Sequence, residues 1–242
     1  MTASILITRP NPAGTMFADH LRTKLGKDCA ICTSPLMQIE VCANLPDLAE
    51  IATLIFTSRH GVEAFAQQSD RRDIPAYAVG ETTGNVARQL GLSVTAGDGD
   101  AERLIAKILH DNPPAPCLHV RGDHVAAPVA KILSDAGIET HEAVAYMQKP
   151  LQLSDAAQRL LHQSAPVILP LFSPRSAKLF FSQPGVTDWK ATLYILAISA
   201  SAADQVPLPW AKRLTIAKNP TASAMMQALQ RLYREVNRLE GS

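Results

Sequence analysis

Short apolar runs alternate with amphipathic segments along most of the chain. The first apolar run, residues 5–7, is followed by a segment in which Phe17, Leu21 and Leu25 recur every four residues. This spacing predicts one buried face of a helix, and Gly26 follows where a helix C-cap is expected. Further strands and helices alternate after it in the same way. A strand–helix–strand alternation of this kind predicts parallel sheets with right-handed crossovers.

The second half of the chain repeats the order of features found in the first half. Each half has a strand ending in Arg, a strand ending in Ser and Arg, a strand before a turn of small residues, and a short strand before an Ala-containing helix. This ordered recurrence predicts an internal duplication and a two-domain α/β protein. The paired segments are SILITRP with PCLHVRGD, TLIFTSR with VILPLFSPR, YAVGETT with YILAISAS, and VTAGDGDAERL with TIAKNPTASAM.

Polar residues stand at the predicted carboxyl ends of the strands, which is where ligands bind in parallel α/β sheets. Ser and Thr at these positions cap helices, and helix N-termini attract carboxylates or phosphates. Any one of these ends, taken alone, is better explained as an ordinary cap or turn. Six such ends with four Arg among them predict a polar cleft that accepts anions. They are Thr8-Arg9, Thr57-Ser58-Arg59, Gly80-Glu81-Thr82-Thr83, Arg121-Gly122-Asp123, Ser173-Pro174-Arg175 and Ser199-Ala200-Ser201.

Composition argues against nucleic acid and membranes as partners. The 242 residues are 47% hydrophobic and 19% charged, with a net charge of +1. Such a balance gives no electrostatic footprint for DNA or a lipid surface, so any anion site must be built locally. No apolar run approaches the roughly 18 residues of a membrane span, and the N-terminus has no signal-peptide core. We therefore expect a cytoplasmic protein.

Common cofactor motifs are absent from the sequence. Gly97 and Gly99 are followed by Glu102 where a dinucleotide fingerprint requires Gly, and no P-loop, H-E-x-x-H or G-x-S-x-G occurs. The histidines lack metal-ligand spacing. Cys29 and Cys32 form a lone C-x-x-C within a strand-like stretch, which favours small buried side chains over a redox or zinc site. Nucleotide-dependent and metal-dependent enzymes are thus disfavoured.

Several short motifs, taken in order, resemble the uroporphyrinogen-III synthase family over nearly the whole chain. Each motif is short and degenerate, and the order and spacing give the resemblance its specificity. The motifs are T-R-P (8–10), LIFTSRHGVEAF (54–65), AVGETT (78–83), LHVRGD (118–123), AY (145–146) and FSPRSA (172–177).

The resemblance implies a fold of two flavodoxin-like α/β domains with parallel sheets, joined by a two-stranded β connection, with the active site in the cleft between them. Domain 1 would comprise residues 1–35 and 150–242, and domain 2 residues 43–142. The connecting strands would be residues 36–42 and 143–149.

The resemblance also implies an activity. The family is a cyclising lyase of haem biosynthesis that converts hydroxymethylbilane into uroporphyrinogen III by losing water and inverting ring D, without cofactor or metal. Its substrate carries eight carboxylates, which suits an anion-accepting cleft. A monomer that receives the bilane from the preceding pathway enzyme is the implied working form.

Tyr146 is the family's candidate acid. A Tyr with its ordinary pKa of about 10 is protonated at neutral pH and can donate, although an ordinary half-buried Tyr would look the same in the sequence. The implied substrate-binding residues are Arg9, Thr57, Ser58, Arg59, Gly80, Thr82, Thr83, Arg121, Gly122, Ser173, Pro174, Ser199 and Ser201.

Two positions depart from the expected pattern. Ser199 stands where the family usually has Gly, and a glycine-dependent positive φ there would be strained for Ser. Pro170 lies inside an expected strand, which predicts an edge strand or a bend. A two-lobed binding or sensor protein for a polycarboxylate is the main alternative function. A two-domain glycosyltransferase is a weaker alternative, because no diphosphate cradle is found.

Overall fold

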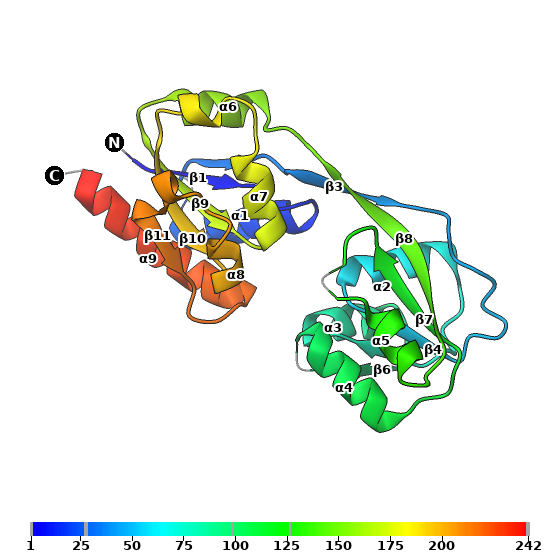
Figure 1. Cartoon of the computed structure of the whole chain (residues 1–242). Coiled ribbons are helices and arrows are strands. Elements are labelled where there is room, and N and C mark those ends of the chain that lie inside the picture. Colours follow the sequence, from blue (N-terminus) through cyan, green and yellow to red (C-terminus); the bar gives the residue numbers. More distant parts are fainter. Residues whose placement is uncertain (1, 27–28, 98, 126, 241–242) are drawn as a thin grey trace. The chain divides into compact units, whose positions relative to one another are not determined.

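The computed structural model forms two compact units (Figure 1), the first made of Met1–Gln38 and Pro150–Ser242 and the second of Ile39–Lys149. Strand β3 (Met37–Val41) crosses one boundary and strand β8 (Thr140–Pro150) crosses the other. The structure describes residues 2–26, 29–97, 99–125 and 127–240.

Unit 1 contains a five-stranded sheet in the order β11-β10-β9-β1-β2, and all its neighbours are parallel. Numbered along the chain within the unit, this order is 2-1-3-4-5, the order of flavodoxin-like folds. The predicted fold class is therefore confirmed for this unit. The strands are β1 (Ser4–Ile7), β2 (Ile31–Thr33), β9 (Pro166–Leu171), β10 (Thr192–Ala197) and β11 (Leu214–Ile216).

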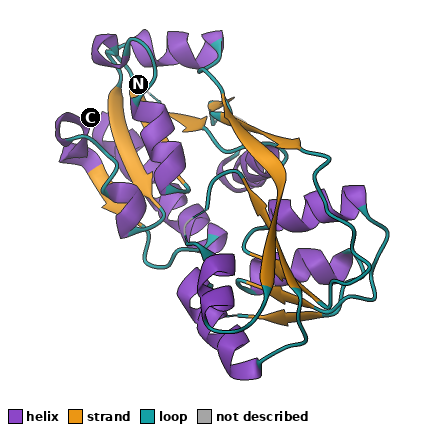
Figure 2. Ribbon diagram, turned by 45° about the vertical axis from the view of Figure 1, so that its right-hand side comes forward, coloured by secondary structure: helices purple, strands orange, loops and turns teal. Residues whose placement is uncertain are grey.

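Helices cover both faces of this sheet (Figure 2). On one face, α1 (Ala13–Leu25) and α9 (Ala222–Glu240) pack against strand residues such as Ile5 and Ile7. On the other face, α6 (Asp155–His162) and α7 (Pro174–Phe181) pack against the alternate strand residues. The predicted face of α1 is confirmed, since Phe17 and Leu21 are buried and Gly26 ends the helix with φ +92°. Short helices complete the unit: η1 (Val186–Asp188), α8 (Ala200–Ala203) and η2 (Leu208–Arg213).

Unit 2 contains a six-stranded sheet in the order β3-β8-β7-β4-β5-β6, parallel from β8 to β6. Its parallel part has the order of unit 1 if β7 is counted first, so the two units are circular permutations of one topology. The corresponding pairs are β1 with β7, β9 with β4, β10 with β5 and β11 with β6. These are the pairs that the sequence duplication predicted. The remaining bounds are β4 (Thr53–Phe56), β5 (Ala76–Ala78), β6 (Val94–Ala96) and β7 (Cys117–Gly122).

The strand residues of unit 2 alternate between two cores. Leu54 and Phe56 face helices α2 (Arg59–Gln68) and α3 (Glu81–Gln89), while Ile55 faces the opposite pair of helices. That pair is α4 (Ala101–Asp111) and α5 (Val129–Asp135). No helix in the described part of the chain is long and apolar enough to cross a lipid bilayer.

The two strands that cross the unit boundaries are neighbours and run antiparallel. The Cys42 N–H donates to the Ala145 carbonyl at 2.8 Å, and the Leu151 N–H donates to the Leu36 carbonyl at 2.8 Å. As the residue number rises on one strand, it falls on the other. This pair is the two-stranded β connection that the resemblance implied.

Pro170 lies in β9, the central strand of its sheet, so the prediction of an edge strand is wrong. Pro170 has a register partner, Leu196, on β10. On the opposite side, the register with β1 joins Val167 and Ile168 and stops before Pro170 is reached. A proline that lacks an N–H is tolerated there because the β1 ladder has already ended.

We expect Gly61→Ala to destabilise unit 2 by about 1–2 kcal/mol. A Cβ at this position would lie 2.6 Å from the Val120 carbonyl oxygen, and overpacking of this kind costs roughly 1–3 kcal/mol, partly offset by the better helix propensity of Ala. Urea unfolding measures the loss. Gln67→Ala, an exposed position of the same helix, serves as the control and should change stability by less than about 0.5 kcal/mol. Equal stability of the two variants would contradict this close approach.

Candidate active site

The ends of β4 and β7 in unit 2 form the point where strand order reverses. In an open parallel sheet this switch point is where ligands bind, beyond the carboxyl ends of the strands. Thr57 and Ser58 directly follow β4, and Arg121 and Gly122 end β7. The topology thus brings together four residues that the sequence predicted for the site.

Ser58 connects this strand end to a helix. It is the N-cap of α2, and its Oγ accepts a hydrogen bond from the Gly61 N–H at 3.1 Å. The same Oγ lies 2.7 Å from the Tyr146 hydroxyl oxygen. Either hydroxyl can donate, so the pair can hold a proton on Tyr146 or pass it through Ser58.

A β-bulge aims the Tyr146 side chain at Ser58. In the register of β7 with β8, Arg121 is opposite Val144 but Gly122 is opposite Tyr146, so Ala145 is the extra residue. Because of this shift, Ala145 and Tyr146 both belong to the core under α2. Bulges next to active sites commonly redirect one side chain in this way.

Gly122 makes room for the Tyr146 ring. A Cβ on Gly122 would lie 2.6 Å from two carbons of the ring and 2.9 Å from its hydroxyl oxygen. The ring of His60 meets the Tyr146 ring edge to face, with the centroids 5.8 Å apart. Tyr146 is consequently only 3% exposed and is fixed on three sides by Gly122, His60 and Ser58.

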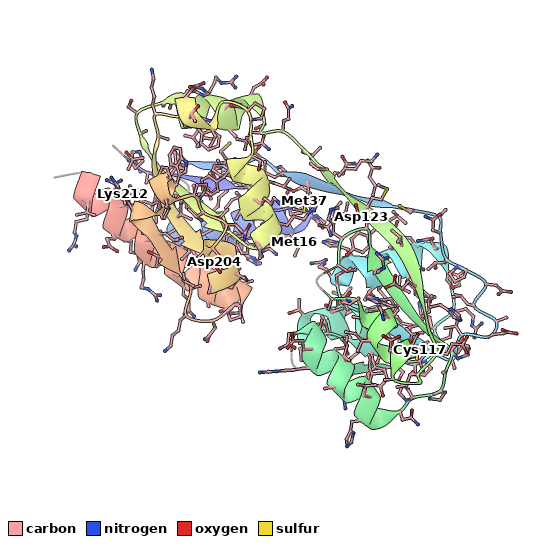
Figure 3. All side chains as sticks on the ribbon, viewed as in Figure 1. Met16, Met37, Cys117, Asp123, Asp204 and Lys212 are labelled. Atoms are coloured by element: carbon pink, nitrogen blue, oxygen red, sulfur yellow. The ribbon has the colours of Figure 1, made fainter. Side chains whose placement is uncertain are left out.

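The environment keeps Tyr146 protonated. Burial raises the pKa of its hydroxyl above the ordinary value of 10, and the nearby Asp123 carboxylate also raises it, whereas the hydrogen bond with Ser58 opposes them. Asp123 follows β7 (Figure 3), and its side chain accepts from the Gln148 N–H at 3.1 Å. A phenol with a raised pKa is a weak neutral acid throughout the physiological range.

The Tyr146 hydroxyl should therefore ionise only above pH 10. Because the folded-state pKa is raised, the stabilisation from the neutral phenol is complete below the unfolded value of about 10 and is lost as pH rises through the folded value. The phenolate absorbance titration of Tyr146→Phe, subtracted from that of the unmodified chain, isolates this group. Tyr77, whose pKa burial raises to about 12, provides a second late-titrating reference. Ionisation of the Tyr146 component below pH 10 would contradict the burial argument.

Two of the predicted arginines are already ion-paired. The Arg59 guanidinium lies 2.6 Å from Glu63, one turn along α2. The Arg121 guanidinium lies 2.9 Å from Glu142 on the neighbouring strand. Their charge is partly neutralised, so a carboxylate ligand would have to compete with Glu63 and Glu142. The site is less cationic than a count of Arg at strand ends indicates.

Gly80 caps α3 at the end of β5 with φ −172°, which is extended backbone. Its equivalent in unit 1, Ser199, caps α8 with φ −153°. The expectation that this turn needs a positive φ is therefore wrong. Gly80 is required for a different reason: a Cβ there would lie 2.9 Å from the Cα of Gly99. At Ser199, instead, the side-chain Oγ accepts from the Ala202 N–H at 3.3 Å.

The threonines that follow Gly80 differ in exposure. Thr83 is buried, with 6% of its surface exposed, whereas Thr82 is open to solvent. In unit 1, Ser201 is exposed and its Oγ lies 3.0 Å from that of Ser199. Thr82, Ser199 and Ser201 can therefore present hydroxyls to a ligand, whereas Thr83 presents little of its surface.

The switch point of unit 1 lies at the ends of β1 and β9 and carries Arg9 and Ser173. The Arg9 guanidinium carbon is 4.1 Å from the centroid of the Phe172 ring, a cation–π contact. Ser173 is the N-cap of α7, with Pro174 in the first turn, and its Oγ accepts from the Ser176 N–H at 3.0 Å. Ser173 and Ser58 thus hold equivalent places in the two units.

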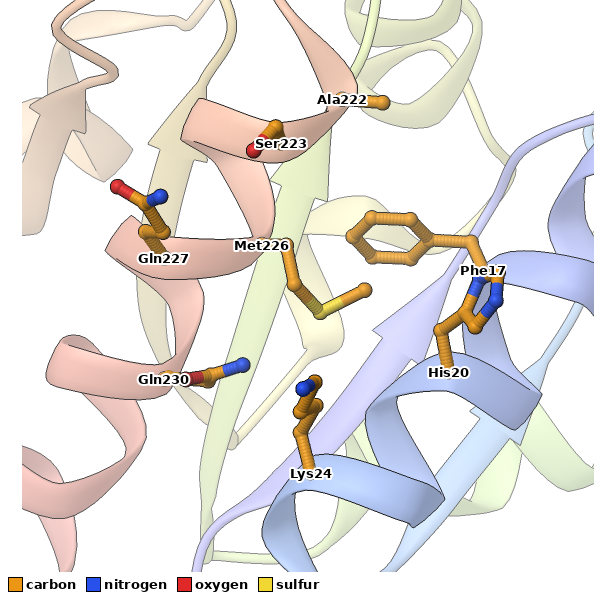
Figure 4. A pocket seen from close by; sticks show the side chains of 8 residues that line it. All are labelled: Phe17, His20, Lys24, Ala222, Ser223, Met226, Gln227 and Gln230. Carbon is orange, nitrogen blue, oxygen red and sulfur yellow. The ribbon is translucent and has the colours of Figure 1, made fainter.

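A cavity of about 480 Å³ lies between α1 and α9 of unit 1 (Figure 4). Phe17 and Met226 lie side by side in it, with Lys24 contributed by α1. None of the residues that the sequence predicts for the site lines this cavity. The C-x-x-C motif also stays outside the site: Cys29 is buried, and Cys32 is half-buried on β2.

Sequence reasoning missed His119 and Glu142, which stand beside the predicted residues. His119 lies on β7, and its Nε2 is 3.0 Å from the Thr57 hydroxyl oxygen. Glu142 pairs with Arg121. Only the register of β4, β7 and β8 places these residues together, and a single sequence does not reveal that register.

Most of the chain is similar to known proteins in sequence and in fold. The family model described as uroporphyrinogen-III synthase HemD matches residues 27–227. A uroporphyrinogen-III synthase of Chlorobaculum parvum is 25% identical over 216 residues, which cover 82% of this chain and 86% of that protein.

Two solved structures share the fold. Uroporphyrinogen-III synthetase from Helicobacter pylori superposes with a TM-score of 0.68 at 19% identity, covering 96% of this chain and 100% of that chain. A mutant uroporphyrinogen III synthase from the extremely thermophilic bacterium Thermus thermophilus gives a TM-score of 0.59 at 13% identity, covering 97% and 100%.

Proposed function

The chain belongs to the uroporphyrinogen-III synthase family, and we propose that Tyr146 is the acid that releases water from its substrate. Members of this family are cyclising lyases of tetrapyrrole biosynthesis that act on a small linear tetrapyrrole. The observation that carries the proposal is the 2.7 Å contact between the Tyr146 and Ser58 hydroxyls at the switch point of unit 2.

In the proposed step, the Tyr146 hydroxyl protonates the hydroxyl of the terminal hydroxymethyl group, which leaves as water while the electron-rich pyrrole supplies the electron pair. A weak acid suffices because the pyrrole drives the departure. The substituted carbon of ring D then attacks the methylene that has lost water and forms a spiro intermediate. The original bond between that carbon and the methylene of ring C breaks, and this methylene bonds instead to the free α-carbon of ring D, which inverts the ring. Closure of the macrocycle releases one proton, and that proton restores the Tyr146 phenol.

To select the type III isomer, the enzyme must control the orientation of ring D, because a faster closure alone would not decide which isomer forms. The bilane closes unaided to the unrearranged type I isomer, so the enzyme must hold ring D with the competing carbon away from the reactive methylene. A difference of about 1.4 kcal/mol between the two orientations already gives tenfold selectivity.

We propose that the strand ends of both units bind the substrate's carboxylates. The positive ends of helix dipoles suit anions, and the N-caps of α2, α3 and α7, which are Ser58, Gly80 and Ser173, lie at carboxyl ends of strands. Thr82, Pro174, Ser199 and Ser201 would border the same ends, and Arg9 would add a charge. Arg59 and Arg121 would contribute only where a substrate carboxylate displaces their glutamate partners.

Isomer analysis tests the function. Freshly generated hydroxymethylbilane is supplied to the protein, the products are oxidised, and the isomers are separated chromatographically. We expect the type III isomer in excess, formed faster than the unaided reaction. Type I product alone, at the uncatalysed rate, would refute the function and would favour a polycarboxylate-binding protein.

We further propose that the chain works as a cytoplasmic monomer that takes the bilane from the enzyme that makes it. Because the substrate closes unaided, the bilane that spends time free in solution forms the type I isomer.

Sedimentation velocity tests the monomer and should give a single species of 26.1 kDa. When the two enzymes are coupled, added inert protein that slows diffusion should leave the type III fraction unchanged; a fall in that fraction would argue for release into solution.

A further inference from the structure

A row of polar side chains runs across three neighbouring strands of unit 2. Thr57 follows β4, His119 lies on β7 and Glu142 lies on β8. His119 is 0% exposed, and its Nε2 lies 3.0 Å from the Thr57 Oγ1. Its other ring nitrogen, Nδ1, lies 3.7 Å from the Glu142 Oε1 and has no hydrogen-bond partner among the described residues. Glu142 is itself held by Arg121 at 2.9 Å. Thr57 is the first member of this row and is partly exposed, just beyond the carboxyl end of β4.

His119 is neutral at physiological pH. Burial and the nearby Arg121 charge lower its pKa to about 4, although the Glu142 carboxylate opposes them. A neutral imidazole has one N–H and one lone pair, so one ring nitrogen donates and the other accepts. The direction of the bond to Thr57 therefore depends on which nitrogen carries the proton.

The Glu142 carboxylate decides between the two tautomers. With the proton on Nδ1, an N–H dipole faces the carboxylate, which is favourable although 3.7 Å is too long for a hydrogen bond. With the proton on Nε2, a lone pair would face that carboxylate in a buried setting, which is unfavourable. The proton accordingly lies on Nδ1, and Nε2 accepts the hydrogen bond from the Thr57 hydroxyl.

We propose that His119 is a positioning residue that fixes the Thr57 hydroxyl as a hydrogen-bond acceptor, so that Thr57 binds a pyrrole N–H of the substrate and not a carboxylate. With its own proton committed to His119, Thr57 Oγ1 offers only lone pairs to a ligand. A carboxylate would find no donor there, whereas a pyrrole N–H would find an acceptor. This inference rests on the proposed function for its ligand, but not for the tautomer.

The tautomer can be tested without any activity measurement. In protein labelled with ¹⁵N-histidine, long-range ¹H–¹⁵N correlation identifies which ring nitrogen carries the proton. The His119 signals are assigned by their loss in His119→Gln or, if that variant does not fold, by their shift in Thr57→Val. We expect a neutral ring protonated on Nδ1 between pH 8 and about 5. A proton on Nε2, or a charged ring at pH 7, would overturn the proposal.

Kinetics test the role of Thr57. We expect Thr57→Val, which keeps the shape but removes the acceptor, to raise KM about tenfold with kcat changed less than about threefold. Thr57→Ser should restore KM to within about threefold. An unchanged KM in Thr57→Val would overturn the binding role, whereas absence of type III product from the unmodified chain would instead refute the proposed function. The histidine spectrum distinguishes these failures because it needs no substrate.

Discussion

Replacing Tyr146 by phenylalanine is expected to slow formation of uroporphyrinogen III by about 100-fold, the lower range of general acid catalysis, because the electron-rich pyrrole needs only a weak acid. The ring would still fill the space beside Gly122 and His60. The hydroxyl pair with Ser58 would be lost, and with it about 1 kcal/mol of stability. Turnover of hydroxymethylbilane at saturating substrate measures the effect.

Tyr77→Phe is the matched control for this substitution. Tyr77 lies in the same unit, and its hydroxyl donates to Asp111 at 3.0 Å, at α4. Its loss should cost similar stability and leave the rate within about twofold. If Tyr146→Phe turned over at the unmodified rate, Tyr146 would have no part in the chemistry.

Replacing Gly122 by alanine is expected to reduce the same rate by at least as much and also to destabilise unit 2 by about 1–3 kcal/mol. The new methyl group would lie 2.6 Å from the Tyr146 ring, so the ring would have to leave its place and the contact with Ser58 would break. The rate and the urea unfolding midpoint are measured together.

A double-mutant cycle shows whether this effect acts through the ring. In a Tyr146→Ala background the ring is absent, so Gly122→Ala should then cost less than about 0.5 kcal/mol. An equal cost in both backgrounds would mean that Gly122 is needed by the backbone and not by Tyr146.

The sequence predicted the scaffold well because the scaffold depends on local patterns. The four-residue spacing of Phe17, Leu21 and Leu25 and the following Gly26 define α1, and the structure confirms both the helix and its end. The duplicated order of strand ends correctly predicted that β4 and β5 of unit 2 occupy the same positions in their sheet as β9 and β10 occupy in the sheet of unit 1. These features can be recognised from the order and spacing of residues along the chain.

Features that depend on contacts between strands could not be predicted in the same way. The bulge that turns Tyr146 toward Ser58 is one extra residue, Ala145, and it is defined only by the register of β8 with β7. The sequence predicted a positive φ at the turn of Ser199, whereas both Ser199 and its equivalent Gly80 are extended, and Gly80 instead accommodates the close approach of Gly99. His119 could not be recognised from its neighbours in the sequence, because its partners Thr57 and Glu142 lie on or next to other strands.

The most direct test of Tyr146 as the acid compares two leaving groups. An aminomethyl bilane carries an amine that is already protonated at neutral pH and leaves as ammonia, so it needs no acid from the enzyme. We predict that Tyr146→Phe is slower than the unmodified chain by about 100-fold with the hydroxymethyl substrate but by less than about threefold with the aminomethyl substrate. The same loss with both substrates would contradict proton donation by Tyr146 and would leave it a role in packing alone.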